Sequence, residues 1–279
     1  MSRTYPISIV DVFAEKPLAG NQLAVVQDAQ TLTDQQMQDI ARETNFSETT
    51  FVVARSAGRA TVRIFTPSAE LPFAGHPTLG TAWELTEGQG EIVLDLGLGP
   101  VPVSFDAGIG WMTPPEVQFN GSIEPANAAQ LIGIDEDELS ASLPIELAQV
   151  GPRFVLLPVR DLAVLRRAKL NGQLHAELVE RGIGVQCVFV FTDDAYEPDA
   201  NYASRMFFNA AGIREDPATG SANTAFAAYL YKHFGSIGEV VVDQGVEIQR
   251  PSRLYLHVGE PLRVGGRVQP VVRGELTLP

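Results

Sequence analysis

Two turns in the sequence share the spacing Glu-x-Pro-x-x-Gly and carry residues that could bind an anion or move a proton. The first turn, residues 70–75, is followed directly by His76, and the second, residues 215–220, contains Asp216. Glycine lets a ligand approach the backbone closely, and exposed N–H groups at the start of a helix bind anions. A histidine or a carboxylate there can polarise a substrate or transfer a proton. We therefore take these turns as the candidate site.

Each turn stands between a strand-like stretch and an apolar helical stretch. Residues 63–65 lead into the first turn, and a helix running through 79–85 follows it. Residues 205–208 lead toward the second turn, and a helix over 221–230 follows that one. Both helices contain Thr-Ala-aromatic. A strand-turn-helix unit that occurs twice predicts a duplicated fold, with two helix N-termini available to one site.

Each candidate residue also has an ordinary structural interpretation. His76 could cap a helix in a plain turn, and Asp216 and Thr219 could be simple N-caps, which use the same residue types. Glu48, at the mouth of a strand, could be a solvated strand end, and Ser47 beside it could be a turn residue. The repeated spacing argues against independent caps, because two unrelated caps need not share it. Spacing alone favours no role for Glu48 or Ser47.

The charge of the chain limits its partners. Its 279 residues include 20 Lys and Arg against 34 Asp and Glu, a formal net charge of −14. Such an acidic chain repels nucleic acid and anionic lipid at long range, so neither is an expected partner. A small anionic substrate is still expected, because a helix N-terminus attracts it locally. The length suits two domains of ordinary size.

Cysteine and histidine usage argues against disulfides, metal sites and thiol chemistry. Cys187 is the only cysteine and lies in the apolar run 185–191, which predicts a buried, small hydrophobic side chain. His175, His233 and His257 stand in unrelated segments without a carboxylate or thiol at ligand spacing, so we expect no metal. No Gly-x-Gly-x-x-Gly and no P-loop occurs, so we expect no cofactor. The sequence turns polar again at Asp11 and has no apolar run of ~20 residues, so we expect no signal peptide, no membrane span and a cytoplasmic protein.

The remaining pattern predicts short strands mixed with helices. The clearest helix follows Thr33, which forms a capping box with Gln36. The proline-bearing stretch 114–125 is the expected crossing between the two halves. Further helices are expected near 126–132 and in 162–181. Further strands are expected near 7–13, 23–26, 49–54, 91–96, 101–105, 145–150, 154–158 and 185–191, and in the tail over 239–278.

Several stretches occur together in the order that is typical of one family. These stretches are 11–14, 20–21, 45–52, 63–67, 70–78, 215–222 and 244–252. They resemble the PhzF-like isomerases of phenazine biosynthesis, which share the diaminopimelate-epimerase fold. The resemblance spans nearly the whole chain. Its most specific parts are the Gly-His-Pro of the first turn and the Asp-Pro-Ala-Thr-Gly-Ser of the second.

The resemblance implies an α+β fold of two pseudo-symmetric lobes. Each lobe would be a mixed β-sheet curled around a central α-helix, with the site in the cleft between the lobes. The expected N-terminal lobe is 1–115, completed by the C-terminal strands in 262–279, and the expected C-terminal lobe is 116–261. The resemblance also implies a homodimer.

The resemblance assigns roles to individual residues. It implies that Glu48 is the carboxylate that transfers the proton, while His76 and Asp216 bind and polarise the substrate. The residues that it implies for the lining of the substrate pocket are Asn21, Ser47, Gly75, Gly220 and Ser221.

The resemblance also bears on the type of reaction. Related epimerases and racemases use a cysteine at one or both turns, but this chain has Ala74 and Pro217 there, and Cys187 elsewhere. A single carboxylate can instead remove a proton from one carbon and return it to another on the same face. We therefore expect a cofactor-independent isomerase of a small, carboxylate-bearing, dihydro-hydroxyanthranilate-like molecule. A single-base epimerase of a small carboxylate and a non-catalytic binding relative are the alternatives.

Overall fold

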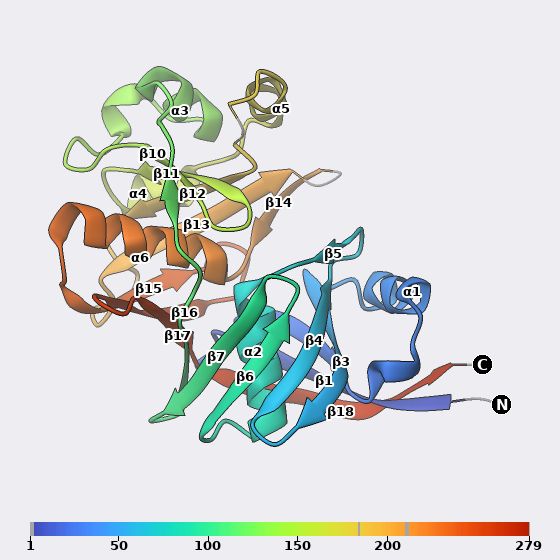
Figure 1. Ribbon diagram of the computed structural model, residues 1–279. Coiled ribbons are helices and arrows are strands. Elements are labelled where there is room, and N and C mark those ends of the chain that lie inside the picture. Colours follow the sequence, from blue (N-terminus) through green and yellow to red (C-terminus); the bar gives the residue numbers. More distant parts are fainter. Residues whose placement is uncertain (1–2, 184, 210–211, 279) are drawn as a thin grey trace. The chain divides into compact units, whose positions relative to one another are not determined.

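The computed structural model describes residues 3–183, 185–209 and 212–278 (Figure 1). Strands and helices are mixed along this part of the chain, which confirms the expected α+β class. None of the described helices is long and apolar enough to cross a membrane. Residues 1–2 and 279, which the sequence assigns to the first lobe, lie outside the described part.

The chain divides into two compact units, and the first of them is built from both ends of the sequence. It joins Met1–Pro114 with Gly265–Pro279, whereas the second unit is Pro115–Val264. The strand β17 (Arg263–Gly266) returns the chain to the first unit. The other elements of the first unit are β1 (Arg3–Val12), β2 (Asn21–Val26), η1 (Ala29–Thr31), α1 (Asp34–Thr44), β3 (Glu48–Ser56), β4 (Arg59–Phe65), β5 (Glu70–Leu71), α2 (Gly75–Thr86), β6 (Glu91–Leu96), β7 (Gly99–Asp106), β8 (Ile109–Met112) and β18 (Val268–Leu278).

The strands of the first unit form a mixed sheet that curls around α2 (Figure 1). β1 pairs antiparallel with both β18 and β2, and β2 runs parallel to β3. β4 pairs antiparallel with β3 and β5 and parallel with β6, and β6, β7 and β8 continue as antiparallel neighbours. Parallel neighbours need a crossover, which α1 supplies between β2 and β3, and α2 between β4 and β6.

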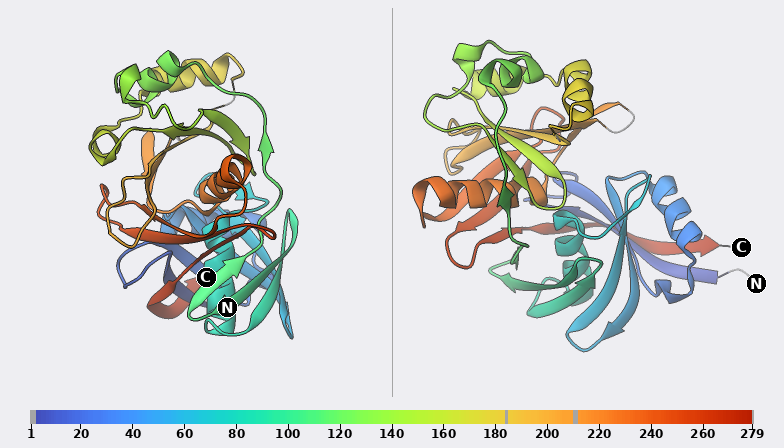
Figure 2. Two further views of the ribbon diagram at one scale, coloured as in Figure 1. Left: turned by 90° about the vertical axis from the view of Figure 1, so that its left-hand side faces the viewer. Right: turned by 45° about the horizontal axis from the view of Figure 1, so that its top comes forward.

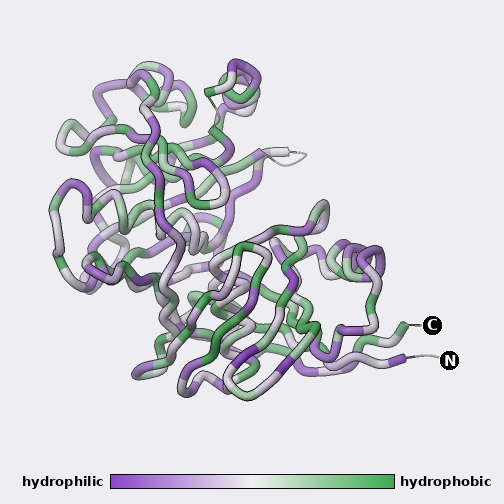
Figure 3. Tube along the Cα trace, in the orientation of Figure 1, coloured by the Kyte–Doolittle hydropathy of each residue, from purple (hydrophilic) through white to green (hydrophobic). Residues whose placement is uncertain are grey.

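The helix α1 forms for local reasons that the sequence already shows. Thr33 Oγ1 accepts a hydrogen bond from the Gln36 backbone N–H at 3.2 Å, and Gln36 Oε1 accepts one from the Thr33 N–H at 3.0 Å. The helix ends at Asn45, whose left-handed φ of 53° closes the last turn. Met37 and Ile40 are buried, while hydrophilic residues cover the rest of the helix (Figure 3). The expected capping box is confirmed.

The helix α2 is buried along almost its whole length, as expected for a helix with few polar residues on any side. Gly80 lies where this helix comes closest to the sheet. A Cβ atom at Gly80 would lie 2.6 Å from Leu23 Cδ2 and 2.7 Å from Val12 Cγ2. The absence of a side chain therefore lets α2 rest directly on β1 and β2.

The second unit repeats this plan around α6, which is enclosed by strands (Figure 2). β11 runs parallel to β12, β13 pairs antiparallel with β12 and β14 and parallel with β15, and β15 pairs antiparallel with β16. The elements of this unit are β9 (Gln118–Phe119), α3 (Pro125–Ile132), η2 (Glu136–Glu138), β10 (Glu146–Gln149), β11 (Arg153–Pro158), α4 (Leu162–Arg167), α5 (Gly172–Glu180), β12 (Cys187–Thr192), β13 (Tyr202–Asn209), β14 (Ile213–Asp216), α6 (Gly220–Phe234), β15 (Gly238–Gln244) and β16 (Ser252–Val258).

The core of the second unit has two parts. Aromatic rings join α6 to the sheet, with the Phe226 centroid 4.5 Å from Phe191 and 5.5 Å from Phe189. A separate hydrophobic cluster joins α3, α4 and α5 to the strands, and it includes Val164 and Leu178. The sheet is thus covered by apolar side chains on both faces, as its near-continuous hydrophobic strands predict.

Some local expectations differ from the structure. The first strand starts at Arg3 and not within 7–13, because it pairs along its whole length with β18 at the other end of the chain. The two polar turns also contain short strands, since Glu70 begins β5 and Asp216 ends β14. Both differences arise because strand pairing with residues elsewhere in the chain defines these strands, and the local sequence does not show such pairing.

Candidate active site

The first group of candidate residues lies in the first unit, where α2 begins beside the starts of two parallel strands. Asn21 opens β2 and Glu48 opens β3, with Ser47 directly before it and Leu23 opposite it in the ladder. His76 is the second residue of α2, and its Nδ1 lies 3.5 Å from Glu48 Oε2 and 3.4 Å from Asn21 Nδ2. The structure thus brings together Asn21, Glu48 and His76.

Burial keeps the His76 imidazole neutral. The residue is only 4% exposed, and this desolvation lowers its pKa to about 3, against the opposing effect of a hydrogen bond with the Gln22 backbone. At neutral pH the 3.5 Å approach to Glu48 is therefore a polar contact between a carboxyl group and a neutral ring. His76 Nε2 is buried and makes no hydrogen bond within the described residues. This nitrogen can donate to a ligand or accept from it, depending on the tautomer.

The N-terminus of α2 offers further donors. Its N-cap residue is Ala74, which supplies no side-chain hydrogen bond. The backbone N–H groups of Gly75 and His76 bond to no acceptor in the described part of the chain, whereas Thr78 N–H reaches the Ala74 carbonyl at 3.3 Å. Two unsatisfied N–H groups at a helix N-terminus can bind an anion. His76 therefore does not cap this helix, and that alternative is wrong.

The second group lies in the second unit around Asp216, which is 8% exposed. Thr219 Oγ1 donates to Asp216 Oδ2 at 2.5 Å, and Gln244 Nε2 donates to the Asp216 carbonyl at 2.9 Å. Gln244 Oε1 in turn accepts from Asn223 Nδ2 at 3.0 Å. Sequence reasoning missed Asn223 as a member of this group. A polar side chain inside an otherwise apolar helix was the available signal.

The start of α6 resembles the start of α2. Thr219 is the N-cap residue, yet its side chain caps no backbone N–H because its hydroxyl donates to Asp216. The N–H groups of Gly220 and Ser221 likewise bond to no described acceptor. Ser221 is the second residue of α6, as His76 is of α2. The interpretation of these residues as plain caps is therefore wrong for the Thr219 side chain.

Cys187 lies closer to this second group than its position in the sequence suggests. It opens β12 and is partly exposed, not fully buried as expected. Burial first, and then the negative charge of Asp216, raise the pKa of its thiol to about 12. Cys187 and Asp216 lie on the two strands that flank β13. Cys187 pairs with Phe208 on one side of β13, and Asp216 pairs with Met206 on the other. The group at Cys187 is thus a protonated thiol within electrostatic reach of Asp216.

An arginine supports each turn, and the sequence analysis missed both. Arg63 donates twice to Glu70, at 2.7 and 2.6 Å, and Arg205 donates twice to Glu215, at 2.9 and 2.6 Å. Each guanidinium also lies over the ring of a phenylalanine two residues later, at 5.1 and 4.7 Å from the centroid. The signal was present as Arg-x-Phe before each Glu-x-Pro-x-x-Gly.

The described residues contain no group of three or more His, Cys, Asp or Glu side chains that could hold a metal ion. The polar groups at the two helix starts are backbone N–H donors, carboxyl groups and a neutral imidazole. Such groups can bind a small acid and exchange a proton with it.

The family model for phenazine biosynthesis-like proteins matches residues 10–275. The chain belongs to this family. A trans-2,3-dihydro-3-hydroxyanthranilate isomerase of Pseudomonas aeruginosa is 35% identical over 88% of each chain. The expected PhzF-like family is confirmed, and its relatives bear out the expectation of an isomerase.

Solved structures of PhzF-like proteins share the whole fold. A phenazine biosynthesis protein of the PhzF family from Bacillus anthracis superposes with a TM-score of 0.88 at 28% identity, covering 98% of this chain and 99% of that one. A hydroxyproline epimerase from Agrobacterium vitis has a TM-score of 0.65 at 13% identity, covering 99% of this chain and 93% of that one. The second likeness shows the fold alone.

Proposed function

We propose that this PhzF-like protein is a cofactor-independent isomerase that moves a proton between two carbons of a small, carboxylate-bearing molecule. The observation that carries the proposal is the pairing of Glu48 with the buried, neutral His76, whose Nδ1 lies 3.5 Å from Glu48 Oε2. A carboxyl group next to an uncharged imidazole is able to take up and release a proton. The name of the Pseudomonas aeruginosa relative supports a substrate related to dihydro-hydroxyanthranilate.

The reaction needs one acid–base group and no redox partner. The Glu48 carboxylate removes a proton from one carbon, and the electron pair of that C–H bond enters the conjugated system of the substrate. The same carboxylic acid then returns the proton to another carbon, where a new C–H bond forms. One C–H bond is broken and one is made, so the product is an isomer.

The remaining residues are proposed to hold and polarise the substrate. The backbone N–H groups of Gly75 and His76 suit a carboxylate or a developing oxyanion. His76 Nε2 adds a polar group without adding a positive charge. Asp216 is proposed to bind a polar substituent of the substrate, with Gly220 and Ser221 as further donors. Asn21 positions the imidazole, and Ser47 lies beside Glu48.

The test compares rate with binding in Glu48→Gln. Glutamine keeps the shape of the side chain and removes the base, so turnover of trans-2,3-dihydro-3-hydroxyanthranilate should fall by at least ~10²-fold. The dissociation constant for a non-reacting anthranilate should stay within ~3-fold of wild type, because the N–H donors are unchanged. Glu43→Gln, an exposed change on α1, is the matched control and should react like wild type. Wild-type turnover in Glu48→Gln would contradict the proposed role of Glu48 as the proton-transferring group.

Two measurements separate the alternatives. An isomerase moves a double bond, so the ultraviolet spectrum of the substrate changes, whereas an epimerase inverts one centre and leaves the spectrum unchanged. In deuterated water an isomerase places solvent deuterium at the receiving carbon whenever the acid exchanges before it returns the proton. A binding relative would bind the substrate and produce neither change.

We further propose a cytoplasmic homodimer. Light scattering on the purified protein should give about twice the chain mass of 30.1 kDa, and cell fractionation should place it in the cytoplasm. A mass equal to one chain would contradict the dimer.

A further inference from the structure

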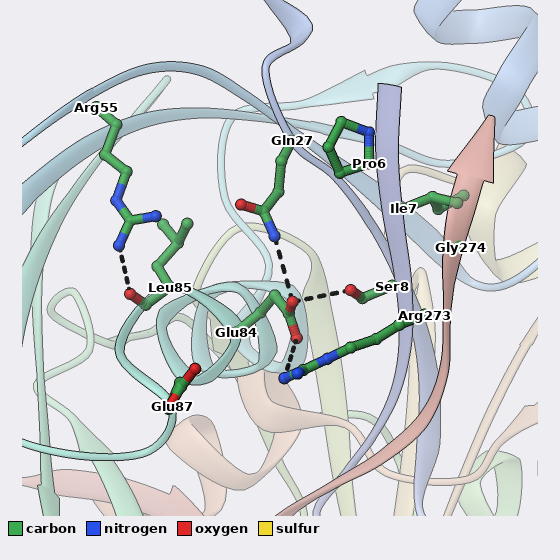
Figure 4. Close-up of a pocket in the computed structure, with 10 residues that line it drawn as sticks. All are labelled: Pro6, Ile7, Ser8, Gln27, Arg55, Glu84, Leu85, Glu87, Arg273 and Gly274. Atoms are coloured by element: carbon green, nitrogen blue, oxygen red, sulfur yellow. Dashed lines mark hydrogen bonds and ion pairs between the residues drawn. The ribbon is translucent and has the colours of Figure 1, made fainter. Parts of the chain in front are cut away.

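A polar pocket lies in the first unit, at the end of α2 opposite to His76. Glu84, which lies inside this pocket, follows His76 by eight residues, or about 12 Å along the helix. The cavity has a volume of about 320 Å³. The residues that line it are Pro6, Ile7, Ser8, Gln27, Arg55, Glu84, Leu85, Glu87, Arg273 and Gly274 (Figure 4). Neither the expected catalytic residues nor the two turns contribute to it.

The carboxylate of Glu84 is buried and accepts hydrogen bonds through only one of its two oxygens. Its side chain is 5% exposed. Its Oε1 accepts from Ser8 Oγ at 2.8 Å and from Gln27 Nε2 at 3.2 Å. Its Oε2 makes no hydrogen bond within the described residues but forms an ion pair with Arg273, whose Nη2 lies 3.8 Å away (Figure 4). A buried carboxylate oxygen without a hydrogen-bond donor is costly, and a donor at hydrogen-bond distance would lower that cost.

The surroundings of Glu84 favour a cationic donor. The last turn of α2 ends at this pocket, and the negative end of its helix dipole attracts positive charge. That last turn contains no basic residue. Glu87, the C-cap residue, adds a second carboxylate at the rim. An ammonium group at Glu84 Oε2 would be attracted by the Glu84 carboxylate, by the C-terminal end of the helix dipole and by the Glu87 carboxylate.

A positively charged group, the guanidinium of Arg55 on β3, also lines the pocket. Arg55 Nη2 donates to the Leu85 carbonyl at 2.6 Å, which fixes the guanidinium at the pocket (Figure 4). The Nε and Nη1 groups of Arg55 make no hydrogen bond in the described part of the chain. A guanidinium with unused donors in a fixed plane is suited to a carboxylate. The pocket therefore presents an acceptor for a cation and a donor set for an anion.

We propose that this pocket binds a small zwitterion, with its ammonium group on Glu84 and its carboxylate on Arg55. Because the two charged partners are separate side chains on α2 and β3, the proposed ligand is an ω-amino acid, in which a short chain separates the two charged groups. Arg273 is the internal competitor, since its guanidinium is the cation now closest to Glu84 Oε2. Its side chain is 59% exposed, so the ammonium group of the ligand would displace it toward solvent.

The test is calorimetric titration of the full-length protein with glycine, β-alanine, 4-aminobutyrate and 5-aminovalerate. At least one of them should bind with saturation at a Kd below ~10 mM. n-Butylamine and butyrate, which each carry one of the two charges, should bind at least ~10-fold more weakly than the best zwitterion. Glu84→Gln and Arg55→Met should each weaken that zwitterion at least ~10-fold, and Arg273→Met should strengthen it because the competing cation is removed.

Glu43→Gln is again the matched control and should bind like wild type. Arg55 is exposed, so Arg55→Met tests the proposal even if Glu84→Gln fails to fold. The proposal is overturned if no zwitterion binds with saturation, if both variants bind like wild type, or if n-butylamine binds as tightly as the best zwitterion. Isomerase activity is measured separately, so failure here leaves the proposed reaction untouched.

Discussion

The turn before α2 and the turn before α6 have the same construction but opposite surroundings. In the first unit, Arg63 and Glu70 are 27% and 43% exposed in their side chains. In the second unit, the matching Arg205 and Glu215 are 9% and 8% exposed. Arg205 Nη1 also donates to three backbone carbonyls at the end of α4. One sequence motif thus serves as a surface ion pair in one unit and as a buried network in the other.

The strand register makes the two units comparable residue by residue. Phe65 lies opposite Glu70, and Phe207 lies opposite Glu215 in the same way. On its other side Phe65 pairs with Thr49, as Phe207 pairs with Val188. The residues just before these partners, which open β3 and β12, are therefore equivalent.

Glu48 in the first unit therefore corresponds to Cys187 in the second. His76 likewise corresponds to Ser221, since each is the second residue of its helix. The first unit places a carboxylate and an imidazole where the second places a thiol and a hydroxyl. The two units share the strand pairing and the supporting arginines, while the acid–base groups differ. We conclude that the repeated scaffold supplies helix N-termini twice, whereas the proposed proton transfer needs the residues of one copy.

The largest expected effect concerns the two arginines. Arg205→Met leaves Glu215 buried without its partner, so it should lower the free energy of unfolding by about 3–5 kcal/mol. Arg63→Met breaks two solvent-accessible ion pairs, with Glu70 and Asp34, that water can replace, and it should cost at most ~1 kcal/mol. Urea unfolding of both variants measures the difference. Equal losses would mean that burial does not distinguish the two turns.

The next effect is a pH dependence that belongs to the first unit. The pKa of His76 is lowered to about 3 in the folded protein, so the unfolded chain binds a proton more readily below pH ~6.5. The contribution of this group to the free energy of unfolding is fully present above that pH. It falls as the pH drops toward 3, by up to ~1.4 kcal/mol per pH unit. His76→Asn should remove that part of the slope. Urea unfolding at pH 7, 5.5 and 4.5 tests this, and an unchanged slope would contradict it.

The smallest effect is expected at the counterpart of Glu48. Cys187→Ser should change stability by about 1 kcal/mol and turnover by less than ~3-fold, because a protonated thiol takes no part in the proposed reaction. The pKa of about 12 also predicts that iodoacetamide labels folded Cys187 far more slowly than the unfolded chain at pH 8. Rapid labelling together with a loss of turnover would restore a role for the thiol.

The sequence predicts features whose causes are local. The capping box at Thr33 and Gln36 and the apolar helices after both turns depend on residues within a few positions of each other. The full length of β1 depends on β18, which is more than 250 residues away, so no local pattern could show it.

The candidate site follows the same rule. His76 and Asp216 stand out through their motifs, but Glu48 was assigned only through a family resemblance. The contact of Glu48 with His76 joins the start of β3 to the start of α2, and the nearness of Cys187 to Asp216 arises across three strands. Asn223 and Glu84 were missed because a buried polar residue in a helix shows its partners only after folding.

Gly80 sets how closely α2 packs on the sheet. The space between the helix and the sheet at that residue is too small for a side chain, because a single added carbon would overlap Leu23. His76 lies four residues before this contact and Glu84 four residues after it, on one continuous helix. A side chain at residue 80 would therefore have to displace the helix from β1 and β2, and would move His76 and Glu84 together with it.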